Sequence, residues 1–125
     1  MPTTLPDLLA VPAHRAAAIE RHAAEFTAGR TVALLTHINS DGDGCGSEAA
    51  LALLLAQRGM KVRIVNPTPW PGVFEFLLDG DAERSAQGAS ALAGVALVMV
   101  LAIRDLNRLG ALADAVRHSH ARRLV

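Results

Sequence analysis

Residues 31–59 read TVALLTHINSDGDGCGSEAALALLLAQRG, and this stretch decides the fold. Its first six residues, 31–36, form a short apolar run that is typical of a strand buried on both faces of a parallel sheet. Ser47 and Glu48 suit the cap and first turn of the strong helical pattern that follows, and Gly59 closes that pattern. The stretch therefore predicts a strand, a glycine-rich loop and a helix in immediate succession.

The segments on either side repeat this alternation. An amphipathic helical pattern over residues 13–28 comes first, and the strand-like run 61–66 follows the stretch. The remaining expected elements are one or two short helical turns at 73–78, a surface loop at 81–90, a strand at 95–103, a helix at 109–119 and the opening of a strand at 122–125. Strands that alternate with helices predict an α/β fold with an open, mostly parallel, doubly wound (Rossmann-like) sheet.

The composition fits one domain. The chain has 125 residues, of which 51% are hydrophobic, so it can bury one core but is too short for two. Its 12 Lys and Arg balance 12 Asp and Glu, which argues against a globally basic nucleic-acid binder, and 3% aromatic residues leave little for base stacking. The single cysteine, Cys45, excludes an internal disulfide and fits a reducing compartment.

The sequence carries no pattern typical of export or membrane insertion. Residues 1–10 lack the basic and then apolar order of a secretory signal. The longest apolar stretch, 91–103, is well short of the roughly 20 residues that span a bilayer. We therefore expect a cytoplasmic protein with no membrane partner.

The loop at 37–46 lies where a site is expected, because ligands of open α/β sheets bind at the carboxyl ends of the strands. Three familiar loop motifs do not fit it. Its glycines, at 42, 44 and 46, do not match the dinucleotide pattern GxGxxG. A phosphate-binding P-loop requires a lysine that this loop lacks, and an EF-hand starting at Asp41 requires a glutamate where Ala52 stands.

What the loop does contain is one imidazole and two carboxylates, in the order His37, Asp41 and Asp43. Mixed nitrogen and oxygen ligands suit Mn²⁺ or another first-row divalent ion, and adjacent carboxylates can each coordinate a different ion of a two-metal site. The same residue types also occur in solvated turns, where Asp and Asn side chains bond to the local backbone. Spacing alone leaves both interpretations open.

Together with its surroundings, this loop resembles a known family. The DHH phosphoesterases contain, in the same order, segments similar to LLTHINSDGDGCGSE at 34–48, KVRIVNP at 61–67, PGVFEFLL at 71–78 and VALVMVLAIRDLNRLG at 95–110. The likeness is strongest to the branch of nanoRNases and 3′-phosphoadenosine 5′-phosphate phosphatases, which is related to the RecJ exonucleases.

The resemblance implies a doubly wound domain that holds two Mn²⁺ ions, followed by a smaller DHHA1 domain that binds substrate. Members of the family hydrolyse phosphoester bonds with a metal-bound water as nucleophile. Carried over to this sequence, His37, Asp41 and Asp43 match the first metal motif. The implied substrate is a short oligoribonucleotide or a 3′-phosphorylated nucleotide.

Two features depart from the family pattern. Near the end of the strand at 95–103 the family has an aspartate that bridges the two metals, whereas this sequence has Ala102, with Asp105 three residues later. The family's Asp-His-His motif is expected just after a strand such as ARRLV, where this sequence ends at Val125. We therefore expect residues 1–125 to be a partial DHH domain, truncated after its fourth strand and without a DHHA1 domain.

Two hypotheses about activity follow. In the first, the chain is the N-terminal part of a Mn²⁺-dependent phosphoesterase, with at most a partial metal site and no activity by itself. In the second, it is a degenerate, non-catalytic DHH-like module that binds a metal or a partner. In either case an uncovered sheet would favour self-association.

Overall fold

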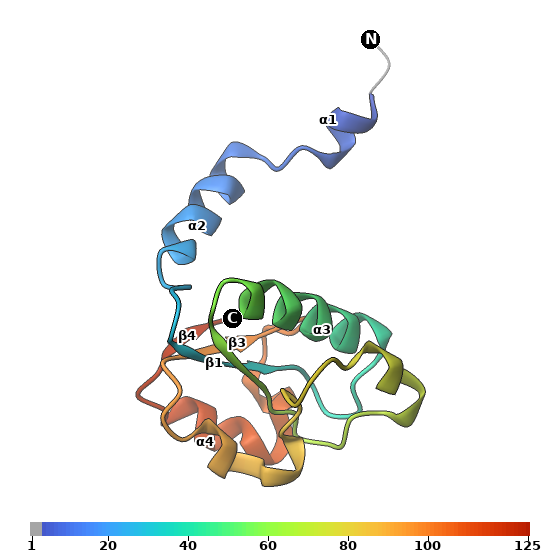
Figure 1. Cartoon of the computed structure of the whole chain (residues 1–125), viewed down its shortest axis with the longest axis vertical. Coiled ribbons are helices and arrows are strands. Elements are labelled where there is room, and N and C mark those ends of the chain that lie inside the picture. Colours follow the sequence, from blue (N-terminus) through green and yellow to red (C-terminus); the bar gives the residue numbers. More distant parts are fainter. Residues whose placement is uncertain (1–3) are drawn as a thin grey trace.

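The computed structural model describes residues 4–125 and has a four-stranded sheet at its centre. The strands are β1 (Thr31–Leu35), β2 (Lys61–Ile64), β3 (Leu97–Val100) and β4 (Arg122–Leu124), in the spatial order β2-β1-β3-β4 (Figure 1). Every neighbouring pair of strands is parallel. Successive strands in the chain therefore need crossover connections.

Helices supply these connections. α1 (Leu5–Leu9) and α2 (Ala13–Ala23) precede the sheet, α3 (Gly42–Gln57) joins β1 to β2, and the 3₁₀ helices η1 (Gly72–Leu77) and η2 (Ser85–Leu92) join β2 to β3. η3 (Leu106–Leu112) and α4 (Ala113–Arg117) lead from β3 to β4. None of the helices within residues 4–125 is long and apolar enough to cross a membrane.

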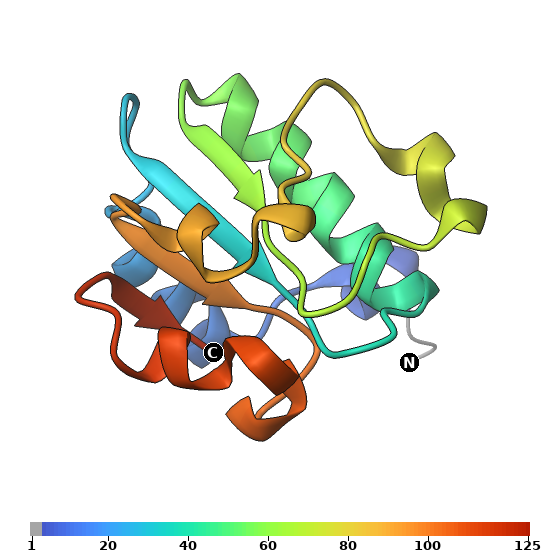
Figure 2. The ribbon, with the colours of Figure 1, turned by 90° about the horizontal axis from the view of Figure 1, so that it is seen from below.

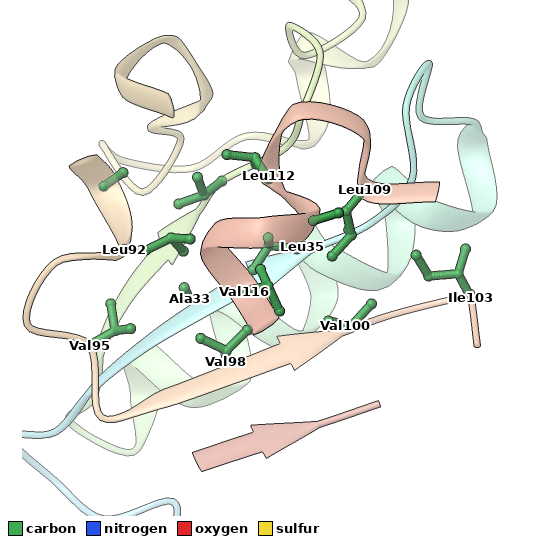
Figure 3. Close-up of a cluster of buried hydrophobic side chains, with 13 residues drawn as sticks. Ala33, Leu35, Leu92, Val95, Val98, Val100, Ile103, Leu109, Leu112 and Val116 are labelled. Atoms are coloured by element: carbon green, nitrogen blue, oxygen red, sulfur yellow. The ribbon is translucent and has the colours of Figure 1, made fainter. Parts of the chain in front are cut away.

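Successive residues of β1 point to opposite faces of the sheet and enter two separate cores. Val32 and Leu34 pack with Leu55 of α3 on one face. On the other face, Ala33 and Leu35 pack against a larger cluster (Figure 3), formed by Val65, Ala91, Leu92, Val95, Val98, Val100, Ile103, Leu109, Leu112, Ala113 and Val116. Because both faces of the sheet are covered, β1 is apolar throughout, and the predicted doubly wound α/β class is confirmed.

β1, β2 and β3 end at one common edge of the sheet. Leu34 of β1 pairs with Ile64 of β2 on one side and with Met99 of β3 on the other. Figure 2 shows the three strands pointing to that edge, where the loop between β1 and α3 lies. The segments that follow the three strands therefore lie close to one another.

The first predicted helix is too long. It ends at Ala23 instead of near Gly29, because the next backbone hydrogen bonds, from the Glu25 N–H to His22 and from the Phe26 N–H to Ala23, span three positions instead of the four of an α-helix. None of the residues of α2 is buried, and Figure 1 shows α2 standing away from the sheet. The helix therefore contributes little to either core.

The start of α3 was also wrongly predicted. The helix begins at Gly42, five residues before Ser47, because the Asp41 side chain caps it by accepting a hydrogen bond from the Gly44 N–H at 2.8 Å. Glu48 consequently lies inside the helix and is fully buried, where a first-turn position had been expected.

Candidate functional site

The loop from β1 to α3 is held in place by hydrogen bonds within itself and by hydrogen bonds to the segments that follow β2 and β3. Asn39 adopts a left-handed backbone conformation, with φ 51°, and its N–H donates to Thr68 Oγ1 at 2.8 Å. The Ser40 hydroxyl donates to the His37 carbonyl oxygen at 3.2 Å. The loop therefore presents His37 and Asp41 from a fixed backbone.

Asp41 is anchored by the helix that it caps. Its Oδ1 accepts the Gly44 N–H, which leaves Oδ2 free of that bond, and the side chain is 62% exposed. The Gly44 hydrogen bond holds the pKa of Asp41 below its ordinary value against the opposing effect of burial, and His37 lowers it further. Asp41 is thus a carboxylate at neutral pH.

His37 is buried, and its ring is oriented by the backbone. Its Nδ1 lies 2.7 Å from the Ile38 carbonyl oxygen. A carbonyl oxygen only accepts, so Nδ1 carries a proton and donates, and this leaves Nε2 with the lone pair in the neutral ring. Histidines that bind metals usually donate their other ring N–H to a carbonyl or carboxylate oxygen in this way.

His37 Nε2 and Asp41 Oδ2 face each other across 3.6 Å. In a neutral ring both atoms carry lone pairs, so a cation between them, either a proton on Nε2 or a metal ion, makes the contact attractive. The separation is close to the roughly 3 Å between two ligands of one divalent ion with bonds of about 2.1 Å. These two residues fit a divalent metal ion.

Asp43, the third predicted ligand, does not join this pair. It lies in the first turn of α3 and is exposed. Across the part of the chain that the structure describes, no three His, Cys, Asp or Glu side chains are placed to hold one metal ion. The structure therefore brings two of the three predicted ligands together.

The end of β3 lies directly beside this loop. The Leu101 N–H donates to the Leu35 carbonyl oxygen at 2.8 Å, and the Thr36 hydroxyl donates to the Leu101 carbonyl oxygen at 3.0 Å. Ala102, the next residue, is exposed and has φ 64°. The structure therefore places Leu101, the residue before position 102, directly against Thr36, the residue before His37. No carboxylate stands at position 102.

Asp105 does not take the place of the carboxylate that position 102 lacks. Its Oδ1 accepts the Asn107 N–H at 2.9 Å and caps η3. Arg108, in the same segment, contacts the candidate loop through its backbone, because its carbonyl oxygen accepts the Ile38 N–H at 3.0 Å. The segment after β3 thus supports the loop without adding a ligand to it.

A buried polar pair at this edge was missed by sequence reasoning. Glu48 Oε2 accepts from Asn66 Nδ2 at 3.1 Å, and Asn66 Oδ1 accepts the Thr36 N–H at 2.9 Å. Burial raises the pKa of Glu48 to about 8, against the opposing hydrogen bond from Asn66. A signal existed in the sequence, since Asn66 ends the second strand and Glu48 is the only charged residue in the apolar run before Gln57.

The other chemistry-bearing residues near the loop have structural roles. Burial raises the pKa of Cys45 to about 11, so it is an uncharged thiol at neutral pH. Trp70 Nε1 donates to the Phe74 carbonyl oxygen at 2.9 Å, and a Cβ added at Gly42 would lie 3.4 Å from the Phe74 ring. The two aromatic residues thus pack against each other's segment and against the start of α3.

Comparison with known proteins gives a likeness of fold. No family model matches the chain, and no curated protein matches its sequence. The crystal structure of an exopolyphosphatase-related protein from Bacteroides fragilis superposes with a TM-score of 0.76 over 86% of this chain, at 18% sequence identity. The two chains share a fold. This chain spans 33% of the length of that protein.

Proposed function

We propose that this chain is part of a divalent-metal-dependent phosphoesterase in which His37 and Asp41 bind one Mn²⁺ ion, and Asp43, exposed in the first turn of α3, binds a second ion of a two-metal site. The observation that carries the proposal is the pair formed by His37 Nε2 and Asp41 Oδ2, 3.6 Å apart at the carboxyl end of β1. Its location is where ligands bind in open α/β sheets. The shared fold with an exopolyphosphatase-related protein supports the same chemical class.

Hydrogen bonds to the backbone orient both side chains of this pair. The Ile38 carbonyl oxygen orients the His37 ring, and the Gly44 N–H orients the Asp41 carboxylate. The positive end of the α3 dipole favours a negatively charged phosphate near the loop. A bound divalent ion would polarise the phosphoryl group and lower the pKa of a bound water.

The substrate class divides into two possibilities. The family resemblance of the sequence favours short oligoribonucleotides or 3′-phosphorylated nucleotides, whereas the name of the structural neighbour points to polyphosphate. Both require hydrolysis of a phosphorus–oxygen bond. Assays with a dinucleotide, with 3′-phosphoadenosine 5′-phosphate and with inorganic polyphosphate separate these substrates.

A second candidate function is a non-catalytic metal-binding module, and Ala102 favours it. Two-metal catalysis needs both ions about 3.5 to 4 Å apart, and position 102 supplies no carboxylate to bridge them. The chain by itself should therefore bind Mn²⁺ with modest affinity and show negligible hydrolysis. Metal-dependent turnover by the purified chain, abolished in Asp43→Ala, would favour the enzyme instead.

Calorimetric titration with Mn²⁺ tests the site. Asp41→Asn should weaken binding about tenfold or more, because it removes one anionic ligand from a partial site. The matched control is Asp81→Asn, an exposed aspartate that pairs with Arg84 at 3.2 Å, and it should leave binding unchanged. Equal Mn²⁺ affinities of the parent chain and Asp41→Asn would show that the ligand assignment is wrong.

A further inference from the structure

Glu48 is a buried acidic residue that the candidate metal site does not use. None of its surface is exposed, and its Oε2 accepts a hydrogen bond from Asn66 Nδ2 at 3.1 Å. Its Oε1 has no hydrogen-bond partner among residues 4–125. A buried carboxylate with an unpartnered oxygen is costly, so the neutral acid is the favoured form.

Glu48 is one end of a chain of hydrogen bonds that leads to the candidate loop. Asn66 follows the end of β2, and its Oδ1 accepts the Thr36 N–H at 2.9 Å. Thr36 in turn donates through its hydroxyl to the Leu101 carbonyl oxygen, just after β3, at 3.0 Å. These hydrogen bonds therefore connect α3 to the carboxyl ends of β1, β2 and β3. They reach Thr36, the residue directly before His37.

The orientation of Asn66 depends on Glu48. The Thr36 N–H needs the acceptor oxygen of the Asn66 amide, so the NH₂ group of that amide faces Glu48 and needs an acceptor there. A neutral carboxylic acid offers its carbonyl oxygen without a buried charge. Ionisation of Glu48 would leave a charged, buried oxygen without a hydrogen-bond partner. The cost of that buried charge falls when the Glu48 side chain moves toward water, and this movement breaks its hydrogen bond with Asn66.

We propose that Glu48, as a neutral carboxylic acid, is a positioning residue that acts through Asn66 and Thr36 to hold His37 against Asp41. The consequence of this positioning for metal binding rests on the proposed function. The positioning itself rests only on the hydrogen bonds that join Glu48, Asn66 and Thr36.

The groups around Glu48 favour its neutral form. Burial raises the pKa of Glu48 to about 8, and the negative charge of Glu83, beside β2, adds to this effect. Cys45 of α3 is an uncharged thiol, and Arg63 of β2 donates to two backbone carbonyl oxygens. β1 and β3 carry no titratable side chain.

The same ionisation sets the direction of a stability change. The ordinary pKa of the group is 4.5, and that in the folded chain is about 8, so the folded state binds more protons between these values. The melting temperature of the parent chain should therefore fall as pH rises through this window and level off above it. Glu48→Gln should remove this fall, because glutamine keeps an acceptor for Asn66 and has no ionisable group.

NMR titration of the metal-free parent chain tests the positioning role. The Thr36 amide signal should titrate with a midpoint of about 8, and the signals of the His37 ring should shift with the same midpoint. Both should vanish in Glu48→Gln and persist in the control Glu75→Gln, an exposed acid on η1.

Two results would overturn the role, and neither requires a variant to fold. If neither signal titrates near this pH, Glu48 does not act on the candidate loop through Asn66 and Thr36. If the Thr36 amide titrates and the His37 ring does not follow, Glu48 supports the strand end alone and does not position His37.

Mn²⁺ titration tests the consequence for binding. The ratio of the parent's affinity to that of Glu48→Gln should fall several-fold between about pH 7 and pH 8.5, because only the parent loses the neutral acid over that range. A constant ratio would overturn the coupling to metal binding. A parent chain that binds no Mn²⁺ at any pH would overturn the proposed function instead, and the NMR titration would still decide the positioning role.

Discussion

The carboxyl ends of β1 and β3 are neighbours that share a backbone arrangement and differ in their side chains. Each strand is followed by a non-glycine residue of positive φ and then by an aspartate that caps the next helix. After β1 these residues are Asn39 and Asp41, with φ 51° at Asn39, and after β3 they are Ala102 and Asp105, with φ 64° at Ala102. Between residues 4 and 125 no other non-glycine residue has a positive φ.

The two strand ends differ in how well their residues suit a left-handed backbone conformation. Asparagine tolerates the left-handed region, whereas alanine lacks a side chain that can bond locally there. Asp41 faces His37, while Asp105 only caps its own helix. The β1 end thus combines a suitable turn residue with two candidate ligands, and the β3 end has neither at position 102. An aspartate there would supply both.

The largest effect is expected where α3 packs on the end of β1. A Cβ on Gly44 would lie 2.9 Å from Thr36 Oγ1 and 3.0 Å from Thr36 Cγ2. Gly44→Ala should therefore lower the free energy of unfolding by about 2 kcal/mol, measured by urea denaturation.

Gly46→Ala is the matched control, because a Cβ there would meet nothing within 4 Å. It should raise stability by up to about 1 kcal/mol, since alanine is the better helix former. Equal effects of the two substitutions would contradict the close packing of Gly44 on Thr36.

The fold was predictable because its signals are strong and local. Run 31–36 is short and largely apolar, which is what a strand covered on both faces requires. A helical pattern separates it from the run 61–66, in which Val62, Ile64 and Val65 favour a second strand. The start of α3 was not predictable from the same pattern. It depends on the Asp41 cap and on the contact of Gly44 with Thr36, which joins two segments that only the fold brings together.

The candidate site was predictable in part for the same reason. His37 and Asp41 are close in sequence, so their meeting follows from one loop. The link from Glu48 through Asn66 to Thr36 spans three elements, and it appears only once the strands are in register. The left-handed backbone of Ala102 gives no signal in the sequence, because alanine is an unusual choice for it.

The second prediction restores the missing carboxylate at the β3 end. Ala102→Asp should tighten Mn²⁺ binding about tenfold, or roughly 1.4 kcal/mol, because it adds an anionic ligand beside the loop of His37 and Asp41. Without metal, the added charge near Asp41 should offset the gain in backbone preference. Calorimetry and thermal melts over a Mn²⁺ series measure both effects.

Ala102→Asn separates charge from conformation at the same position. Asparagine shares the tolerance of aspartate for left-handed backbone and lacks its charge. It should raise the melting temperature slightly in all conditions and leave Mn²⁺ affinity close to that of the parent. Equal tightening by both variants would show that position 102 acts through the backbone and not as a ligand.

The third prediction removes the cap at the β3 end. Asp105→Ala should lower the free energy of unfolding by about 1 kcal/mol, because the Asn107 N–H loses its acceptor. Mn²⁺ affinity should stay unchanged, since Asp105 caps η3 and does not face the His37 and Asp41 pair. A marked loss of Mn²⁺ affinity would instead make Asp105 a ligand and narrow the difference between the two strand ends.

The smallest effect is expected for Ala102→Gly, which measures the conformational cost of holding alanine in a left-handed backbone. Ala102→Gly relieves the left-handed conformation, worth roughly 1 to 2 kcal/mol for an L-residue, but it also gives the unfolded chain more freedom, which costs about 0.5 to 1 kcal/mol. A net gain of about 0.5 kcal/mol is therefore expected in urea denaturation. Ala93→Gly is the control, because Ala93 is exposed and has an ordinary φ of -65°. This variant should show only the loss of stability that comes from the freer unfolded chain. If both variants lose the same stability, Ala102 carries no strain, and the two strand ends differ only in their ligands.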